Sequence, residues 1–299
     1  MTSDAYQRLL EKLWAAKDDR IVPVEVMRSG MEAVAFPVAD DVEVEPTQIA
    51  SQPAEWVRAP GADPTRAVLY LHGGGYVMGS LETHRKLAGD VSRAAGVGVL
   101  LLDYPLAPEH PFPAAVDGAV DAFEEIARDL GAGRLAIAGD SAGGGLTMAT
   151  LLALRDRGLA LPAAAVCISP WVDLVNADHS ASPQLEIDPI INVAGLVRMR
   201  DFYAGDTDPS NPLVSPVGAD LAGLPPLLIQ VGGAEVLLDE AVRLAERAQA
   251  AGVDVTLDRW AEMPHVWQVF AGRVPEATEA VDQTGEFIRR HLAGSPADS

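Results

Sequence analysis

The sequence predicts an α/β fold in which helices cover both faces of a mainly parallel sheet. Short apolar runs alternate with helical segments across most of the 299 residues. Such alternation is typical of parallel strands joined by helical crossovers. Several of the runs are apolar throughout, as expected for strands that are buried on both faces. A G-x-S-x-G segment at residues 139–143 joins one of these runs to a helical segment, which is typical of a nucleophile elbow.

Composition excludes several classes of partner. The net charge of −21 would repel nucleic acid and anionic membranes, so we expect neither as a partner. Cys167 is the sole cysteine, which rules out an intrachain disulfide, and its apolar neighbours predict a buried thiol. The sequence has no C-x-x-C or H-E-x-x-H motif, so we expect no metal site.

Nothing in the sequence predicts export or membrane insertion. Residues 1–20 carry four acidic side chains and lack the apolar core of a signal peptide. No apolar run approaches the length of a membrane span. We therefore expect a cytoplasmic protein. The sequence leaves open whether the chain forms a homodimer.

The first 60 residues predict helices followed by strands. Residues 5–17 have leucines and a tryptophan on one side, and residues 22–36 have a weaker helical period. Polar and apolar residues alternate from Val42, which indicates strands. Pro46, Pro53 and Pro60 interrupt these runs and favour edge strands over central ones.

From residue 67 the elements alternate regularly. Strands are predicted at 67–71, 97–102, 135–138, around Val166, 227–231 and 253–260. Helices are predicted at 81–95, 116–130, between the elbow and Gly158, at 239–251 and at 275–292. Residues 173–212 contain four prolines and one helical stretch, 193–203. We interpret them as an insertion between two strands.

The elbow predicts a nucleophilic serine. Glycines flank Ser141 because in such a tight turn a β-carbon would collide with neighbouring backbone. The serine side chain should project from the top of the sheet, and the N–H of Ala142 should point at the same space.

A second glycine-rich motif, His72-Gly73-Gly74-Gly75, leaves the strand at 67–71. Acyl transfer develops negative charge on the carbonyl oxygen, and fixed backbone N–H groups stabilise that charge. Glycines let this backbone approach the substrate closely. The motif therefore predicts an oxyanion loop, within which His72 is structural rather than a base.

These two motifs, with the loop Tyr104–Pro113, resemble the hormone-sensitive lipase-like family of α/β-hydrolases. The resemblance covers roughly residues 55–292 and implies an α/β-hydrolase fold with a helical cap. It also implies Ser141 as the nucleophile of a carboxylesterase, and N–H groups of Gly74, Gly75 and Ala142 as oxyanion donors.

The resemblance further implies a division of the chain. Residues 1–45 and the insertion 173–212 would pack together as the cap, and residues 46–299 would otherwise form the catalytic domain. One departure is Pro105, where the family usually has arginine. It affects a supporting contact of this loop and not the catalytic residues.

The catalytic histidine can be identified from the order of the catalytic residues along the chain, which in this fold is serine, acid, histidine. His265 and His291 follow the expected acid region. His291 lies beside two arginines on the last helix, where it should be solvated. His265 lies in a loop after a strand and matches the histidine of the family.

Two carboxylates compete for the role of the acid. The family typically has D-P-L-x-D-E after this strand, and matching Leu237 and Asp239-Glu240 places Glu235 at the catalytic position. Glutamate can hold an imidazole as aspartate does, because both are ionised near neutral pH. Asp239 is the rival, although it is better suited to begin the following helix.

The sequence thus predicts a serine esterase that acts on short-chain carboxylic esters through an acyl-enzyme and needs no cofactor. An amidase or formamidase of the same fold is the alternative. A ligand-binding receptor related to the family is a third reading, which the presence of His265 disfavours. Five residues are candidates for the substrate pocket: Tyr76, Trp171, Leu196, Phe202 and Tyr203.

Overall fold

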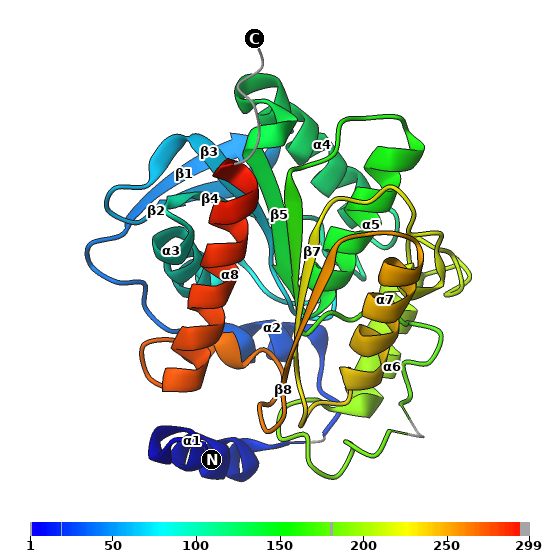
Figure 1. The fold of residues 1–299 in the computed structure, drawn as a ribbon. Coiled ribbons are helices and arrows are strands. Elements are labelled where there is room, and N and C mark those ends of the chain that lie inside the picture. The colour runs from blue at the N-terminus through cyan, green and yellow to red at the C-terminus, as the bar shows by residue number, and fades with distance from the viewer. Residues whose placement is uncertain (1, 19, 180–181, 294–299) are drawn as a thin grey trace.

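The computed structural model describes residues 2–18, 20–179 and 182–293. Within them, eight strands form a sheet in the order β1-β2-β4-β3-β5-β6-β7-β8 (Figure 1). All neighbours from β4 through β8 in that order are parallel, which confirms the predicted mainly parallel sheet. The strands are β1 (Glu43–Ile49), β2 (Gln52–Arg58), β3 (Asp63–Leu71), β4 (Val97–Leu102), β5 (Leu135–Asp140), β6 (Ala164–Ile168), β7 (Leu227–Gly232) and β8 (Val255–Trp260).

Helices cover both faces of the sheet because alternate residues of each central strand point to opposite sides. On one face, α3 (Leu81–Ala95) and α8 (Pro275–Ala293) share a buried cluster with Val68 and Tyr70 of β3. On the other face, Leu69 and Leu71 belong to the core formed with α4 (Ala114–Leu130), α5 (Ala142–Asp156) and α7 (Leu238–Ala250). Short 3-10 turns occur at Ala132–Arg134, Pro216–Gly218 and Trp267–Phe270.

The first two strands differ in part from the prediction. β1 is an edge strand, but β2 lies between β1 and β4, antiparallel to both. The interior position tolerates Pro53 because the pairing with β4 begins only at the next residue, Ala54. The carbonyl of Pro53 still accepts the N–H of Asp103 at 3.0 Å, so the ring removes at most one hydrogen bond, at the end of the β2–β4 ladder.

Three helices lie near the end of the sheet at which α5 begins (Figure 1). They are α1 (Asp4–Ala16), α2 (Val24–Ala33) and α6 (Val193–Ala204). Lys17 donates from Nζ to the carbonyl of Asp188 at 2.7 Å. Arg198 donates from Nη1 to the carbonyl of Val22 at 2.5 Å. The N-terminal segment and the insertion are therefore in contact, while the limits of a separate cap remain a prediction.

Candidate active site

The turn between β5 and α5 places Ser141 in a strained conformation, with φ 53° and ψ −122°. The neighbouring glycines are required by space. A β-carbon on Gly139 would lie 2.3 Å from the carbonyl oxygen of Gly143, and one on Gly143 would lie 1.9 Å from the carbonyl oxygen of Leu71. Backbone strain of this kind persists only where the surrounding structure enforces it. The turn therefore has the geometry expected of a nucleophile elbow.

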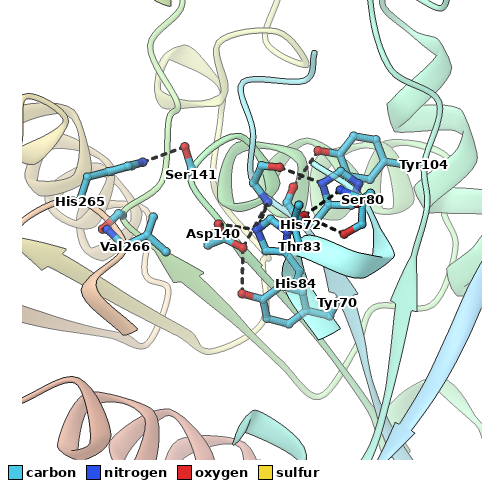
Figure 2. Close-up of polar contacts among 12 residues, drawn as sticks. Tyr70, His72, Ser80, Thr83, His84, Tyr104, Asp140, Ser141, His265 and Val266 are labelled. Atoms are coloured by element: carbon cyan, nitrogen blue, oxygen red, sulfur yellow. Dashed lines mark hydrogen bonds and ion pairs between the residues drawn. The ribbon is translucent and has the colours of Figure 1, made fainter. Parts of the chain in front are cut away.

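Three predicted residues from three different loops come together here. His265 Nε2 lies 2.9 Å from Ser141 Oγ, and His265 Nδ1 lies 2.5 Å from Glu235 Oε2. Ser141 follows β5, Glu235 follows β7 and His265 follows β8. Figure 2 shows the imidazole of His265 pointing at Ser141. A hydroxyl, an imidazole and a carboxylate in this sequence of contacts can activate the hydroxyl as a nucleophile.

Glu235 is fully buried, so its carboxylate needs hydrogen-bond donors. Oε1 accepts from the N–H of Gly232 at 2.6 Å and from Ser169 Oγ at 2.9 Å. Ser169 Oγ also accepts from the N–H of Val266 at 3.1 Å. Ser169 thus links the loops that carry the carboxylate and the imidazole.

Two supporting residues, Ser169 and Asp188, are not predicted from the sequence. Ser169 directly follows β6, the neighbour of β7, and its position at the carboxyl end of a predicted strand was the available signal. Asp188 comes from the insertion and accepts the N–H of Val236 at 2.9 Å. No local pattern indicated that contact, because it joins residues 48 positions apart.

The charge of Glu235 controls the protonation of His265. Burial by itself disfavours a charged imidazole, but the hydrogen bond and the charge of Glu235 outweigh it. The pKa of His265 therefore lies above its ordinary value of 6.5. The imidazolium that forms when His265 takes a proton is accordingly stabilised by its neighbour.

Asp239 lies apart from this group. It is exposed on the first turn of α7, beside a separate depression that Asn176 and Glu240 also line. The expectation that Asp239 begins the helix needs correction. Leu237 is the N-cap, and no side chain makes a capping hydrogen bond there. Asp239 can still stabilise the helix, since a negative charge in the first turn interacts favourably with the positive end of the helix dipole.

The glycine-rich loop at residues 72–75 follows β3 and faces the elbow. His72 is fully buried and donates from Nδ1 to the carbonyl of Gly73 at 2.8 Å. Burial, with the nearby imidazole of His84, lowers the pKa of His72 to about 3, so this ring is neutral. The hydrogen bonds among the described residues outside regular helices and strands include none donated by the N–H of Gly74, Gly75 or Ala142.

Comparison with known proteins identifies the family. A family model described as the α/β hydrolase fold matches residues 68–269. A crystal structure of an esterase from the bacterial hormone-sensitive lipase family superimposes with a TM-score of 0.92 at 44% identity, covering 98% of this chain and 99% of that one. The chain belongs to the hormone-sensitive lipase-like family of α/β-hydrolases.

Further similar proteins are named as esterases or hydrolases. The structure of EstE5 has a TM-score of 0.94 and 46% identity, covering 98% of this chain and all of that one. An acetyl-hydrolase of Streptomyces hygroscopicus is 49% identical over 239 residues, 79% of each chain. An esterase of Acinetobacter venetianus is 34% identical over 254 residues, 84% of each chain. The protein is therefore a carboxylic ester hydrolase.

In this family member, a cavity of about 560 Å³ opens over Ser141. Apolar side chains from the N-terminal segment and from the insertion make up much of its wall. Among the five pocket candidates, Leu196 lines it. The lining includes Leu13, Ile21, Met27, Met31, Val34, Gly74, Gly75, Ser141, Ile190, Leu196, Met199, His265 and Phe270.

The other four candidates lie outside the cavity lining. Tyr76 and Tyr203 are buried and stacked, with 3.7 Å between ring centroids. Trp171 packs beside Tyr76 at 6.0 Å, and Phe112 meets Tyr203 edge-on at 6.1 Å. Phe202 is half-buried beneath the Arg198 guanidinium. Tyr76, Trp171 and Tyr203 therefore belong to the buried core, and none of the four candidates lines the cavity.

The structure also bears on metal binding and on membrane insertion. In residues 2–18, 20–179 and 182–293, no group of three or more His, Cys, Asp or Glu side chains is arranged to hold a metal ion. In the same part of the chain, no helix combines the length and the apolar character needed to cross a bilayer.

Proposed function

We propose that this ester hydrolase is a serine carboxylesterase that forms an acyl-enzyme on Ser141. The observation that carries the proposal is the 2.9 Å contact between Ser141 Oγ and His265 Nε2, with Glu235 at the other imidazole nitrogen. Ser141 Oγ attacks the ester carbonyl while His265 accepts its proton. The tetrahedral intermediate expels the alcohol, which takes that proton from His265.

Deacylation repeats these steps with water. His265 accepts a proton from the water, whose oxygen attacks the acyl carbonyl. The bond to Ser141 Oγ breaks, the proton returns to the serine, and the carboxylic acid leaves. Glu235 stays ionised throughout and stabilises the imidazolium in both halves of the reaction.

The N–H groups of Gly74, Gly75 and Ala142 are the proposed oxyanion donors. They belong to the loop after β3 and to the N-terminus of α5, both beside Ser141. The partial positive charge of a helix N-terminus adds to their effect. One such donor can contribute about 100- to 1,000-fold to kcat.

A small ester is the proposed substrate. The cavity of about 560 Å³ lies within the range of ordinary small-molecule sites. Two relatives support the same size class. One is named an acetyl-hydrolase, and crystals of EstE5 were soaked by p-nitrophenyl butyrate.

The direct test is Ser141→Ala, assayed with p-nitrophenyl butyrate. We expect kcat to fall by about 10⁴-fold or more, because members of such a triad act as a unit. Folding should be retained, and Ser210→Ala, at an exposed serine, is the matched control. Retention of a tenth of the wild-type turnover by Ser141→Ala would refute the mechanism. Faster hydrolysis of a formamide than of the matching ester would favour the amidase reading.

A further inference from the structure

A second carboxylate–imidazole contact lies beside Ser141, and the steps above do not use it. Asp140 immediately precedes the nucleophile, and its Oδ2 lies 3.3 Å from Nε2 of His84 on α3. Both side chains are buried, with 3% and 2% exposure. Both also line the cavity over Ser141. Figure 2 shows this pair next to Ser141, with His265 on its other side.

Asp140 and His84 both contact the N–H of Gly73, the first glycine of the loop at residues 72–75. The N–H of Gly73 points at Asp140 Oδ1 and at His84 Nε2, each at 3.2 Å. Tyr70 donates its hydroxyl to the same Oδ1 at 2.9 Å. A β-carbon on Gly73 would lie 2.2 Å from Asp140 Oδ2. The carboxylate is therefore in direct contact with the loop backbone, and glycine is required at residue 73.

The contact of Nδ1, the other ring nitrogen of His84, bears on which nitrogen carries a proton. When Thr83 Oγ1 donates its proton to the carbonyl of Ser80 at 2.9 Å, Nδ1 of His84 is the donor in its 2.7 Å contact with Thr83 Oγ1. A neutral His84 then accepts the Gly73 N–H at Nε2. A protonated His84 donates from Nε2 to Asp140, and Gly73 donates to Asp140 alone. The amide of Gly73 keeps a partner in both states.

The neighbouring atoms of the loop are fixed as well. Tyr104 donates its hydroxyl to the carbonyl of His72 at 2.7 Å and stacks on the His72 ring at 4.3 Å. The His72 ring in turn holds the carbonyl of Gly73. The next two amides along the chain are those of Gly74 and Gly75. Small errors in the path of the loop at Gly73 would therefore displace these two donors.

We propose that Asp140 and His84 are positioning residues, which hold Gly73 so that the N–H groups of Gly74 and Gly75 point at the oxyanion. The inference rests on the proposed function of Ser141 and its loop. An unpaired carboxylate at this place would oppose negative charge on the substrate oxygen. The contacts from His84, Tyr70 and Gly73 offset that repulsion while Asp140 keeps the loop in place.

The test compares Asp140→Asn, His84→Gln and the double variant, with p-nitrophenyl butyrate as substrate. Because a misplaced donor is less harmful than a deleted one, we expect kcat to fall by about 10- to 100-fold in each single variant. KM should change by less than about threefold, since the donors act mainly in the transition state. The double variant should lose no more than the worse single variant, because the two residues support one amide.

A trifluoromethyl ketone gives a readout that general destabilisation would not move. It forms a tetrahedral adduct with serine and places an oxyanion in the hole, so its inhibition constant should rise in parallel with the fall in kcat. Ser92→Ala removes two buried hydrogen bonds, to the carbonyl of Val97 at the start of β4 and from the N–H of Ala59, at the opposite end of the strands from the catalytic loops, and serves as the control. It should lower the melting temperature without changing kcat.

Other outcomes separate the two proposals. If Ser141→Ala is inactive but Asp140→Asn and His84→Gln keep the wild-type kcat, the positioning role is wrong and the serine mechanism stands. A higher kcat in Asp140→Asn would mean that the carboxylate only repels the oxyanion, which also overturns the proposal. Should Asp140→Asn fail to fold, His84→Gln with the ketone decides the question. If Ser141→Ala remains active, the proposed function itself fails.

Discussion

Glu235 and Asp239 are four residues apart in the chain, yet their surroundings differ completely. Glu235 is buried, accepts two hydrogen bonds at Oε1 and contacts His265 through Oε2. Asp239 is exposed on the first turn of α7. A carboxylate that orients an imidazole must be fixed itself, which favours Glu235 as the acid.

Amide variants of these two residues test that assignment. Glu235→Gln keeps the shape but removes the charge and favours the wrong histidine tautomer, so we expect kcat to fall by about 10⁴-fold. Asp239→Asn removes only a charge from a helix first turn, which costs about 0.3–1 kcal/mol of stability. Turnover and melting temperature of both variants should be measured at one pH. A crippled Asp239→Asn beside a nearly normal Glu235→Gln would identify Asp239 as the acid.

The raised pKa of His265 predicts the pH dependence of the reaction. His265 must be neutral to accept the serine proton, so kcat/KM should rise with pH through a pKa above 6.5 and then level off. In Glu235→Gln the main contribution that raises this pKa is lost while burial remains. The acidic limb of the residual activity should therefore move to lower pH.

A pH–rate profile of kcat/KM for the two proteins provides the measurement. The raised pKa of His265 also affects folding stability, which should fall with rising pH while kcat/KM rises. Protonated His265 contributes stability that is complete below the unfolded pKa, about 6.5. That contribution is lost as the pH rises through the folded pKa. In the pH–rate profiles, an acidic limb at the same pH in the wild type and in Glu235→Gln would contradict the assigned role of Glu235.

Between elements, Arg28 of α2 connects the N-terminal segment to the catalytic core. It donates to Glu109 at 2.7 and 2.8 Å, and to the carbonyls of Val77 and Ala107 at 2.8 and 3.1 Å. Ala107 and Glu109 lie in the proline-rich loop, in which Pro105 replaces the usual arginine of the family. Arg28 thus supplies an arginine contact to this loop from another part of the chain.

Removal of this contact should loosen α2. We expect Arg28→Ala to cost about 1–2 kcal/mol, mainly through the two carbonyl contacts, because the pair with Glu109 is partly exposed and screened. The melting temperature should fall by about 2–8 °C. KM should rise as well, since Met27 and Met31 of α2 line the cavity. Arg290→Ala, which breaks an exposed pair on α8, is the control and should change little.

The sheet was predictable from the sequence because its central strands are buried on both faces. β4, β5, β6 and β7 are buried at every residue, and they are apolar apart from Asp140 at the end of β5 and Gln230 in β7. Ser141 could be located because it directly follows β5, and His265 because it is the loop histidine that follows the last strand, β8, although that strand is only partly buried. The local signal and the tertiary structure agree at these positions.

Other features depend on contacts that no local pattern encodes. The sequence predicts Tyr76, Trp171 and Tyr203 in the pocket, but the rings of Trp171 and Tyr203 pack against Tyr76 in the core. The placement of β2 inside the sheet depends on its pairing with β4, which is distant in the chain. Likewise, the contact of Asp188 with the loop of Glu235 exists only once the insertion has folded over the core.

At the scale of the whole molecule, the N-terminal segment, the insertion and the sheet together bound the substrate cavity. Its wall includes Ile21, Val34 and Ile190, which are 51%, 72% and 37% exposed. Apolar side chains at an open rim can cover a short acyl chain, but a chain that extends past them returns to water. Each methylene buried inside should contribute about 0.8 kcal/mol, and each one outside almost nothing.

A series of p-nitrophenyl esters with acyl chains of increasing length tests this limit. We expect kcat/KM to be highest at about two to six carbons and to decline for longer chains, because further methylenes gain no burial while their ordering still costs entropy. The control is Ser210→Ala, which lies away from the cavity lining and should keep the same profile. A kcat/KM that climbs steadily to long chains would show that the cavity of about 560 Å³ does not set the preference. The wall formed by the N-terminal segment and the insertion would then have to open for long chains.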